Sequence, residues 1–186
     1  MNSFTLIYNI WSDFMDFNQY KRILLIGCPG SGKSTLAKRI GQVTNLPVIH
    51  LDTIYWLPLW ERRSKEEFDS LLLEELKKDK WIIDGNYNRT LDLRISYCDL
   101  IIYLDISRRV CLWSVIKRRF KYAHKTREDM QKNCNEVIDY SFISYVYKFN
   151  KTHRNKYYEM LKNIDKEYIV IRKRKDIDKL FKKDTQ

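Results

Sequence analysis

Residues 27–35 have the composition and spacing of a phosphate-binding loop. The pattern G-x-x-x-x-G-K-S/T is matched by Gly27, Gly32, Lys33 and Ser34. An apolar run precedes this segment and a predicted helix follows it, which is the strand–turn–helix context that the motif requires. Because glycine has no Cβ, the loop backbone can turn its N–H groups inward around a phosphate. The segment therefore predicts a site for the phosphates of a nucleotide.

The parts of this loop have separate predicted roles. Lys33 would place its charge on the β- and γ-phosphates, and the Ser34 hydroxyl is positioned for Mg²⁺. The helix that opens near Lys33 adds the positive end of its dipole and its unpaired N–H groups. We expect ATP with Mg²⁺ as the ligand. The residues predicted to hold the nucleotide are Gly27, Cys28, Pro29, Gly30, Ser31, Gly32, Lys33, Ser34 and Thr35.

Two carboxylates follow predicted strands, at the edge of a parallel sheet where ligands bind. Asp84 has the form of the acidic element that orients Mg²⁺ directly or through water. Asp52 follows Lys33 within one β-α-β unit, so it could orient an acceptor hydroxyl or accept its proton. A helix cap or turn is the alternative role for either residue. Trp56 and Trp60 come next, and could stack a substrate ring or cover the core.

Several arginines could surround the oxygens of a phosphoryl group in transfer. Arg89 follows the Asp84 turn, whose geometry is expected to aim it inward. Arg118, Arg119 and Arg127 border a polar stretch, about 120–135, that resembles a lid closing over the phosphates. We predict catalytic roles for these four arginines, although basic residues on helices are commonly just solvated.

Length and composition limit the remaining classes of protein. With 186 residues, of which 44% are hydrophobic, the chain makes one domain with a sizeable core. No apolar run approaches a membrane span and the four cysteines form no C-x-x-C pair, so we expect a cytoplasmic protein with free thiols and no membrane partner. The net charge of +11 invites nucleic-acid binding, but a phosphate-binding enzyme also needs surplus arginine. The sequence leaves a monomer or a homodimer open.

Apolar strand patterns alternate with helical ones along the chain, and no connection is short enough for a hairpin. The expected fold is α/β: a P-loop NTPase with three α/β/α layers, a five-stranded parallel sheet and a small helical lid. Residues 1–20 are expected to be an N-terminal extension and residues 21–186 the domain. Predicted strands cover 22–26, 48–51, 80–84, 99–105 and 168–171. Predicted helices cover 35–44, 64–80, 91–96, 108–121, 136–163 and 176–181.

The combined motifs resemble the adenylate-kinase-like branch of the P-loop kinases. Asp84-Gly85 with Arg89-Thr90 looks like the D-G-F-P-R-T element of that branch, and Arg118-Arg119 resembles the arginine pair that opens its lid. From residue 21 onward the chain is similar to the bacterial topology modulation proteins, also described as FlaR-like. The segments that carry this similarity are His50-Leu51-Asp52, Trp56, Trp60, Trp81 to Tyr87, Lys125-Thr126-Arg127, Asp129-Met130, Cys134 and Glu136.

This resemblance implies a nucleotide-dependent kinase whose acceptor is unassigned. It also places Asp52 where shikimate- and gluconate-type kinases hold an acceptor-binding aspartate. We therefore expect transfer of the γ-phosphoryl group of ATP to a nucleoside monophosphate or a hydroxylated metabolite. The family name implies an indirect influence on DNA supercoiling, so the alternative is a nucleotide-dependent, DNA-associated regulator.

Overall fold

A five-stranded parallel sheet forms the centre of the computed structural model, which describes residues 15–122, 134 and 140–181. The strand order is β2-β3-β1-β4-β5. The strands are β1 (Arg22–Gly27), β2 (Val48–His50), β3 (Trp81–Asp84), β4 (Leu100–Leu104) and β5 (Glu167–Ile171). The predicted five-stranded parallel sheet is confirmed.

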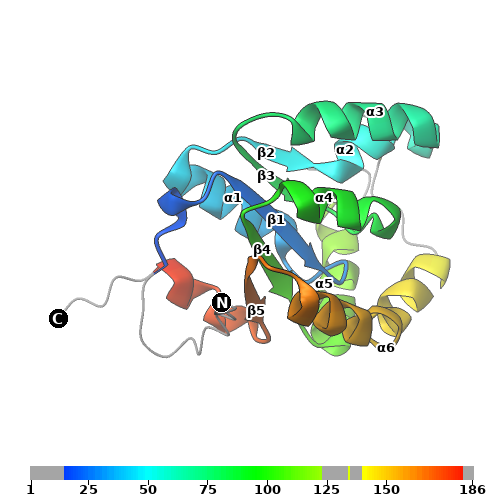
Figure 1. Cartoon of the computed structure of the whole chain (residues 1–186). Helices are drawn as coiled ribbons and strands as arrows, with labels where there is room; N and C mark the ends of the chain where they lie inside the picture. Colours follow the sequence, from blue (N-terminus) through cyan, green and yellow to red (C-terminus); the bar gives the residue numbers. More distant parts are fainter. Residues whose placement is uncertain (1–14, 123–133, 135–139, 182–186) are drawn as a thin grey trace.

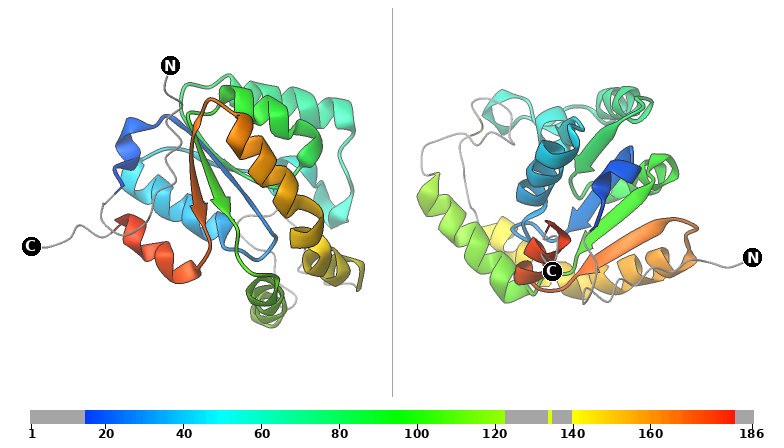
Figure 2. Two further views of the ribbon diagram at one scale, coloured as in Figure 1. Left: turned by 60° about the horizontal axis from the view of Figure 1, so that its bottom comes forward. Right: turned by 90° about the vertical axis from the view of Figure 1, so that its left-hand side faces the viewer.

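Helices cover both faces of the sheet (Figures 1 and 2). They are α1 (Lys33–Thr44), α2 (Leu51–Tyr55), α3 (Lys65–Leu76), α4 (Leu91–Tyr97), α5 (Arg108–Lys121) and α6 (Tyr140–Asn163). The chain runs from β1 outward to β2 through α1, and in the opposite direction through the later helices. Because such crossovers are right-handed, α1 lies on one face, whereas α3, α4 and α6 lie on the other. Within the described ranges, no helix has the length and apolar character to cross a membrane.

The strands are apolar because the helices bury both of their faces. Ile23, Leu24 and Leu25 of β1 are fully buried, as are Ile82 and Ile83 of β3. A sheet with two covered faces therefore explains the uninterrupted apolar runs in the sequence.

Several predicted elements differ from the observed ones in detail. The strand predicted to include Leu51 ends at His50, and Asp52 lies in the first turn of α2. Ser64 caps α3, with its hydroxyl accepting a hydrogen bond from the backbone N–H of Glu67. That helix ends at Leu76, before a polar turn. The predicted terminal helix consists of two 3₁₀ turns, η4 (Arg174–Asp176) and η5 (Asp178–Phe181).

Residues 15–20, assigned from the sequence to an extension, pack on the domain. Met15, Phe17 and Tyr20 are buried, and η1 (Phe17–Gln19) lies against α1. The ring of Phe17 is 5.4 Å from that of Phe181. The apolar composition of this segment explains its burial, and the described core therefore begins before residue 21.

The guanidinium of Arg94 holds the turn that follows β3. Arg94 is 0% exposed and donates to the carbonyl oxygens of Gly85 at 2.9 Å, Tyr87 at 2.7 Å and Thr90 at 3.3 Å. Burial lowers its pKa to about 10, so the side chain remains charged at neutral pH. A buried cation that satisfies three carbonyls fixes the backbone between Asp84 and α4.

Replacing Arg94 should therefore destabilise the domain. We expect Arg94→Met to lower the free energy of unfolding by about 3 kcal/mol, because three carbonyls lose their donor. Denaturant titration followed by circular dichroism measures this change. Arg109→Met, at an exposed position on α5, is the matched control and should stay within about 0.5 kcal/mol of the unaltered protein. Equal midpoints for both variants would contradict the structural role of Arg94.

Candidate active site

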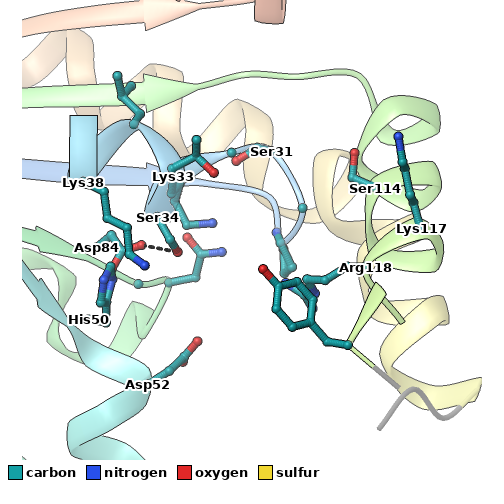
Figure 3. Close-up of a pocket in the computed structure, with 18 of the residues that line it drawn as sticks. Ser31, Lys33, Ser34, Lys38, His50, Asp52, Asp84, Ser114, Lys117 and Arg118 are labelled. Atoms are coloured by element: carbon teal, nitrogen blue, oxygen red, sulfur yellow. Dashed lines mark hydrogen bonds and ion pairs between the residues drawn. The ribbon is translucent and has the colours of Figure 1, made fainter. Parts of the chain in front are cut away.

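A cleft of about 1560 Å³ lies where β1, β2 and β3 end (Figure 3). Its walls come from the loop between β1 and α1, from α2 and the segment after it, and from α5, α6 and the C-terminal turns. Among the residues predicted to do chemistry, Lys33, Ser34, Asp52, Asp84 and Arg118 all line this cleft. The structure thus gathers most of the predicted site at one edge of the sheet.

The phosphate-binding loop depends on left-handed backbone conformations. The φ angles are 144° at Gly27, 78° at Gly30 and 108° at Gly32, in a range that other residues rarely adopt. A Cβ atom at Gly30 would lie 2.5 Å from the carbonyl oxygen of Cys111 on α5. Glycine at position 30 therefore allows both the turn of the loop and its contact with α5.

Lys33 lies across its own loop. Its Nζ donates to the carbonyl oxygens of Gly27 at 2.8 Å and Cys28 at 3.1 Å. Burial lowers the pKa of this amine, and the nearby charge of Asp84 opposes the shift. The ammonium group is therefore held against the loop backbone, at the wall of the cleft.

Ser31 supplies a further test of whether the loop fits phosphate. Its side chain is 0% exposed, and its hydroxyl has no hydrogen-bond partner in the part of the chain that the structure describes. An orphaned buried hydroxyl is costly, and a phosphate oxygen in the loop would satisfy it. Together with the charge of Lys33, this group fits the phosphates of a nucleotide.

Asp84 connects the loop helix to the neighbouring strand. Its Oδ2 accepts the Ser34 hydroxyl at 2.7 Å, and its Oδ1 is 2.6 Å from Nδ1 of His50 (Figure 3). A hydroxyl and a carboxylate beside a phosphate loop are ligands that suit Mg²⁺, which completes its shell with waters and phosphate oxygens. Ser34 and Asp84 therefore fit the predicted metal site, with His50 orienting the carboxylate.

Asp52 projects from the first turn of α2 into the cleft (Figure 3). Its Oδ1 accepts the hydroxyl of Tyr87 at 2.7 Å. Burial raises the pKa of Tyr87, and the charge of Asp52 adds to that shift, so the phenol keeps its proton and donates. The hydrogen bond fixes the orientation of the Asp52 carboxylate in the cleft.

The predicted arginines are not all brought to the cleft. Arg118 lines it, whereas Arg119 is not among the lining residues, and Arg127 lies outside the described residues. The inward direction predicted for Arg89 is wrong, since its guanidinium forms a two-pronged ion pair with Asp69 of α3, both distances being 2.6 Å. Most of the predicted lid, 120–135, also lies outside the described residues.

Sequence reasoning missed two residues that contact the loop. Asn86 accepts the backbone N–H of Gly27 through its Oδ1 at 3.2 Å, and Arg174 of η4 donates to the carbonyl of Gly30. The position of Asn86 two residues after Asp84, in a glycine turn, was a usable signal. Arg174 had no comparable signal, because the basic run that contains it looks like an ordinary solvated turn.

Two other groups next to the cleft have structural roles. The thiol of Cys28 is buried within the loop, and its hydrogen bond with Cys111 raises its pKa, so it stays neutral. Asp105, directly after β4, accepts Nε of Arg154 at 3.0 Å and the hydroxyl of Tyr158 at 2.8 Å. This third strand-end carboxylate anchors α6 and does not line the cleft.

Comparisons with known proteins agree with this fold. No protein-family model matches the chain. An alignment of 103 residues relates the chain to a cytidylate kinase from Pyrobaculum calidifontis at 29% identity. The alignment covers 47% of this chain and 55% of that protein. A shikimate kinase from Acinetobacter baumannii, solved with shikimate, aligns with a TM-score of 0.58 and 15% identity over 88% of this chain and 90% of that one. A shikimate kinase from Bacteroides thetaiotaomicron aligns with a TM-score of 0.51 and 19% identity over 86% of this chain and 92% of that one.

These similarities and the cleft define a class. The chain has a shikimate-kinase-like P-loop fold, with three α/β/α layers around a parallel sheet. The cytidylate kinase match supports a kinase-like protein, although it covers about half of each chain.

Removing the Asn86 amide should weaken nucleotide binding. In Asn86→Ala the N–H of Gly27 loses its partner. We expect the Kd for ATP to rise about fivefold, which corresponds to the free energy of about 1 kcal/mol that one hydrogen bond contributes. Isothermal titration calorimetry measures this Kd. Asn18→Ala, on the exposed turn η1, removes the same side chain far from the loop and should leave the Kd unchanged. An unaltered Kd for Asn86→Ala would remove this residue from the loop's support.

Proposed function

We propose that this protein is a Mg²⁺-dependent phosphotransferase that moves the γ-phosphoryl group of ATP to a small-molecule acceptor. The acceptor is a nucleoside monophosphate or a hydroxylated metabolite. One observation carries the proposal: a phosphate-binding loop and two carboxylates, Asp84 at the end of β3 and Asp52 in the first turn of α2, line one cleft. A protein that merely binds nucleotide needs no carboxylate at the acceptor position.

The residues of the cleft divide the work of phosphoryl transfer. The N–H groups of the loop and the charge of Lys33 bind the phosphates, and the Ser31 hydroxyl donates to a phosphate oxygen. Ser34 and Asp84 would hold Mg²⁺, which neutralises charge on the phosphates when bound. Such transfer depends mainly on positioning and on positive charge, both of which these side chains supply.

Asp52 acts on the acceptor. Its carboxylate, oriented by Tyr87, accepts a hydrogen bond from the acceptor hydroxyl and takes its proton as the new oxygen–phosphorus bond forms. The bond between the γ-phosphorus and the bridging oxygen then breaks, and ADP leaves. Arg118 is positioned to stabilise charge on the transferring group, and we assign the same role to Arg119 and Arg127. Arg89 would have to leave Asp69 to take part.

Support for this proposal comes from outside the cleft as well. The similar proteins are named for kinase activities on cytidylate and shikimate, and one of the shikimate kinases was solved with shikimate. The resemblance to topology modulation proteins points the same way, since those proteins resemble nucleotide-dependent kinases. We therefore propose membership of that family together with the phosphotransferase activity.

Lys33→Ala and Asp52→Asn should separate nucleotide binding from transfer. We expect Lys33→Ala to lower kcat by about 100-fold or more, because a charge on the transferring group is lost. Asp52→Asn should lower kcat about 100-fold and leave the Kd for ATP within about twofold, because the base acts on the acceptor. ADP release during a screen of nucleoside monophosphates and hydroxylated metabolites is the measurement. An unchanged transfer rate in Asp52→Asn would remove Asp52 from its role.

The net charge of +11 favours one second function, a nucleotide-dependent regulator that binds DNA. Titration of the protein with duplex DNA at increasing salt concentration tests this alternative. Tight, steeply salt-dependent binding, with ATP turnover that no metabolite stimulates, would favour the regulator over the phosphotransferase.

A further inference from the structure

We propose that the acceptor is an uncharged, nucleoside-like compound, in which a flat ring with hydrogen-bond acceptor atoms carries the hydroxyl that receives the phosphoryl group. It would bind on a surface that we call the acceptor shelf, made of Asp52, Trp56, Trp60, Arg62 and Tyr87. All five residues line the cleft. The proposal rests on the proposed function and chooses between its two classes of acceptor.

The acceptor shelf lies beside the phosphate loop. Asp52 lies in the first turn of α2 and Trp56 is the C-cap of that helix, where its backbone N–H donates to the carbonyl of Asp52 at 3.1 Å. Cys134 donates to the carbonyl of Leu57, between the two tryptophans, at 3.3 Å and is itself buried, so its thiol packs against this loop. The shelf is therefore a built surface between Asp52 and the outer end of the cleft.

The two tryptophans favour a flat ring. Their rings meet edge to face, with centroids 5.2 Å apart, and the Trp56 ring also meets Tyr55 edge to face at 5.0 Å. Both side chains are half-buried and border the cleft, so they are not part of the described core. Aromatic rings held at fixed angles bind planar ligands with little loss of rotational freedom.

Arg62, next to Trp56, favours a ligand ring that carries hydrogen-bond acceptor atoms. Its guanidinium lies over the Trp56 ring, 5.9 Å from the centroid, and its side chain is exposed at the cleft. A planar guanidinium donates to carbonyl oxygens and ring nitrogens of a ligand in the plane next to it. The ring therefore carries acceptor atoms, as a nucleobase does.

The hydrogen bonding of Asp52 favours a hydroxyl over a phosphate as the receiving group. Tyr87 donates to Asp52, which leaves an anionic carboxylate facing the acceptor. An ionised phosphate oxygen brought to the same place has no hydrogen to donate to this carboxylate. A neutral hydroxyl instead gains a hydrogen bond there.

The test is a panel of acceptors assayed with the full chain, ATP and Mg²⁺. It contains nucleosides, the matching nucleoside monophosphates, and two non-aromatic polyols, myo-inositol and gluconate, with products identified by mass spectrometry. We expect a nucleoside to be converted to its monophosphate, and no nucleoside monophosphate to be converted to a diphosphate. Conversion of the monophosphates, or of the polyols alone, would overturn the proposal.

Variants at the tryptophans supply a second readout. Trp60→Ala should raise the KM for the nucleoside about tenfold and leave the KM for ATP unchanged, because one stacking partner is lost. Trp60→Phe should restore most of the affinity. Trp113→Ala, at a tryptophan of α5 that is 66% exposed and does not line the cleft, is the matched control and should behave like the unaltered protein.

The two proposals fail in different ways. An unchanged nucleoside KM in Trp60→Ala, or no conversion of any nucleoside by protein that binds ATP in calorimetry, would overturn the acceptor assignment. Failure to bind ATP at all would count against the proposed function itself. The acceptor panel keeps the test valid if the alanine variant is unstable, because it uses the unaltered protein.

Discussion

The carboxylate of Asp84 is the contact on which the geometry of the cleft depends. It ends β3 and bonds both the Ser34 hydroxyl, at the start of α1, and His50, at the end of β2. Three elements, α1, β2 and β3, are thereby held at one point, beside the phosphate loop. The turn that follows supplies Tyr87 to Asp52 and Asn86 to Gly27. Arg94 fixes that turn through its carbonyl oxygens, so Asp52 and the phosphate loop have a common support.

The sequence predicted the sheet and the loop because both depend on local information. Buried parallel strands need continuous apolar runs, and the phosphate loop needs glycines and a lysine at fixed spacing. The residue ranges of α5 and β3 were close to those observed for the same reason. Asp52 and Asp84 could be placed at one edge of the sheet because the polarity of parallel strands brings their ends together.

Long-range partners could not be predicted in this way. The direction of Arg89 depends on Asp69, which lies on a different helix and competes with the cleft for its guanidinium. Asp105 also ends a predicted strand, as Asp84 does. In the structure, however, Arg154 and Tyr158 of α6 donate hydrogen bonds to its carboxylate and hold α6 against the sheet. Arg174 reaches Gly30 from the C-terminal turns. A pattern in the chain shows which groups are available, whereas the tertiary fold decides which of them meet.

The close approach of Gly30 to α5 means that the phosphate loop and this helix constrain each other's sequence. The missing Cβ leaves room for the backbone of Cys111 and for the Val115 side chain, which would lie 2.5 Å and 2.9 Å from it. A bulkier side chain at position 115, or a shift of α5 by a fraction of an ångström, would change the conformation of the loop at Gly30. Drift at positions 111 and 115 is therefore tolerated only when it preserves this fit, and the two segments are expected to change in concert among descendants of this chain.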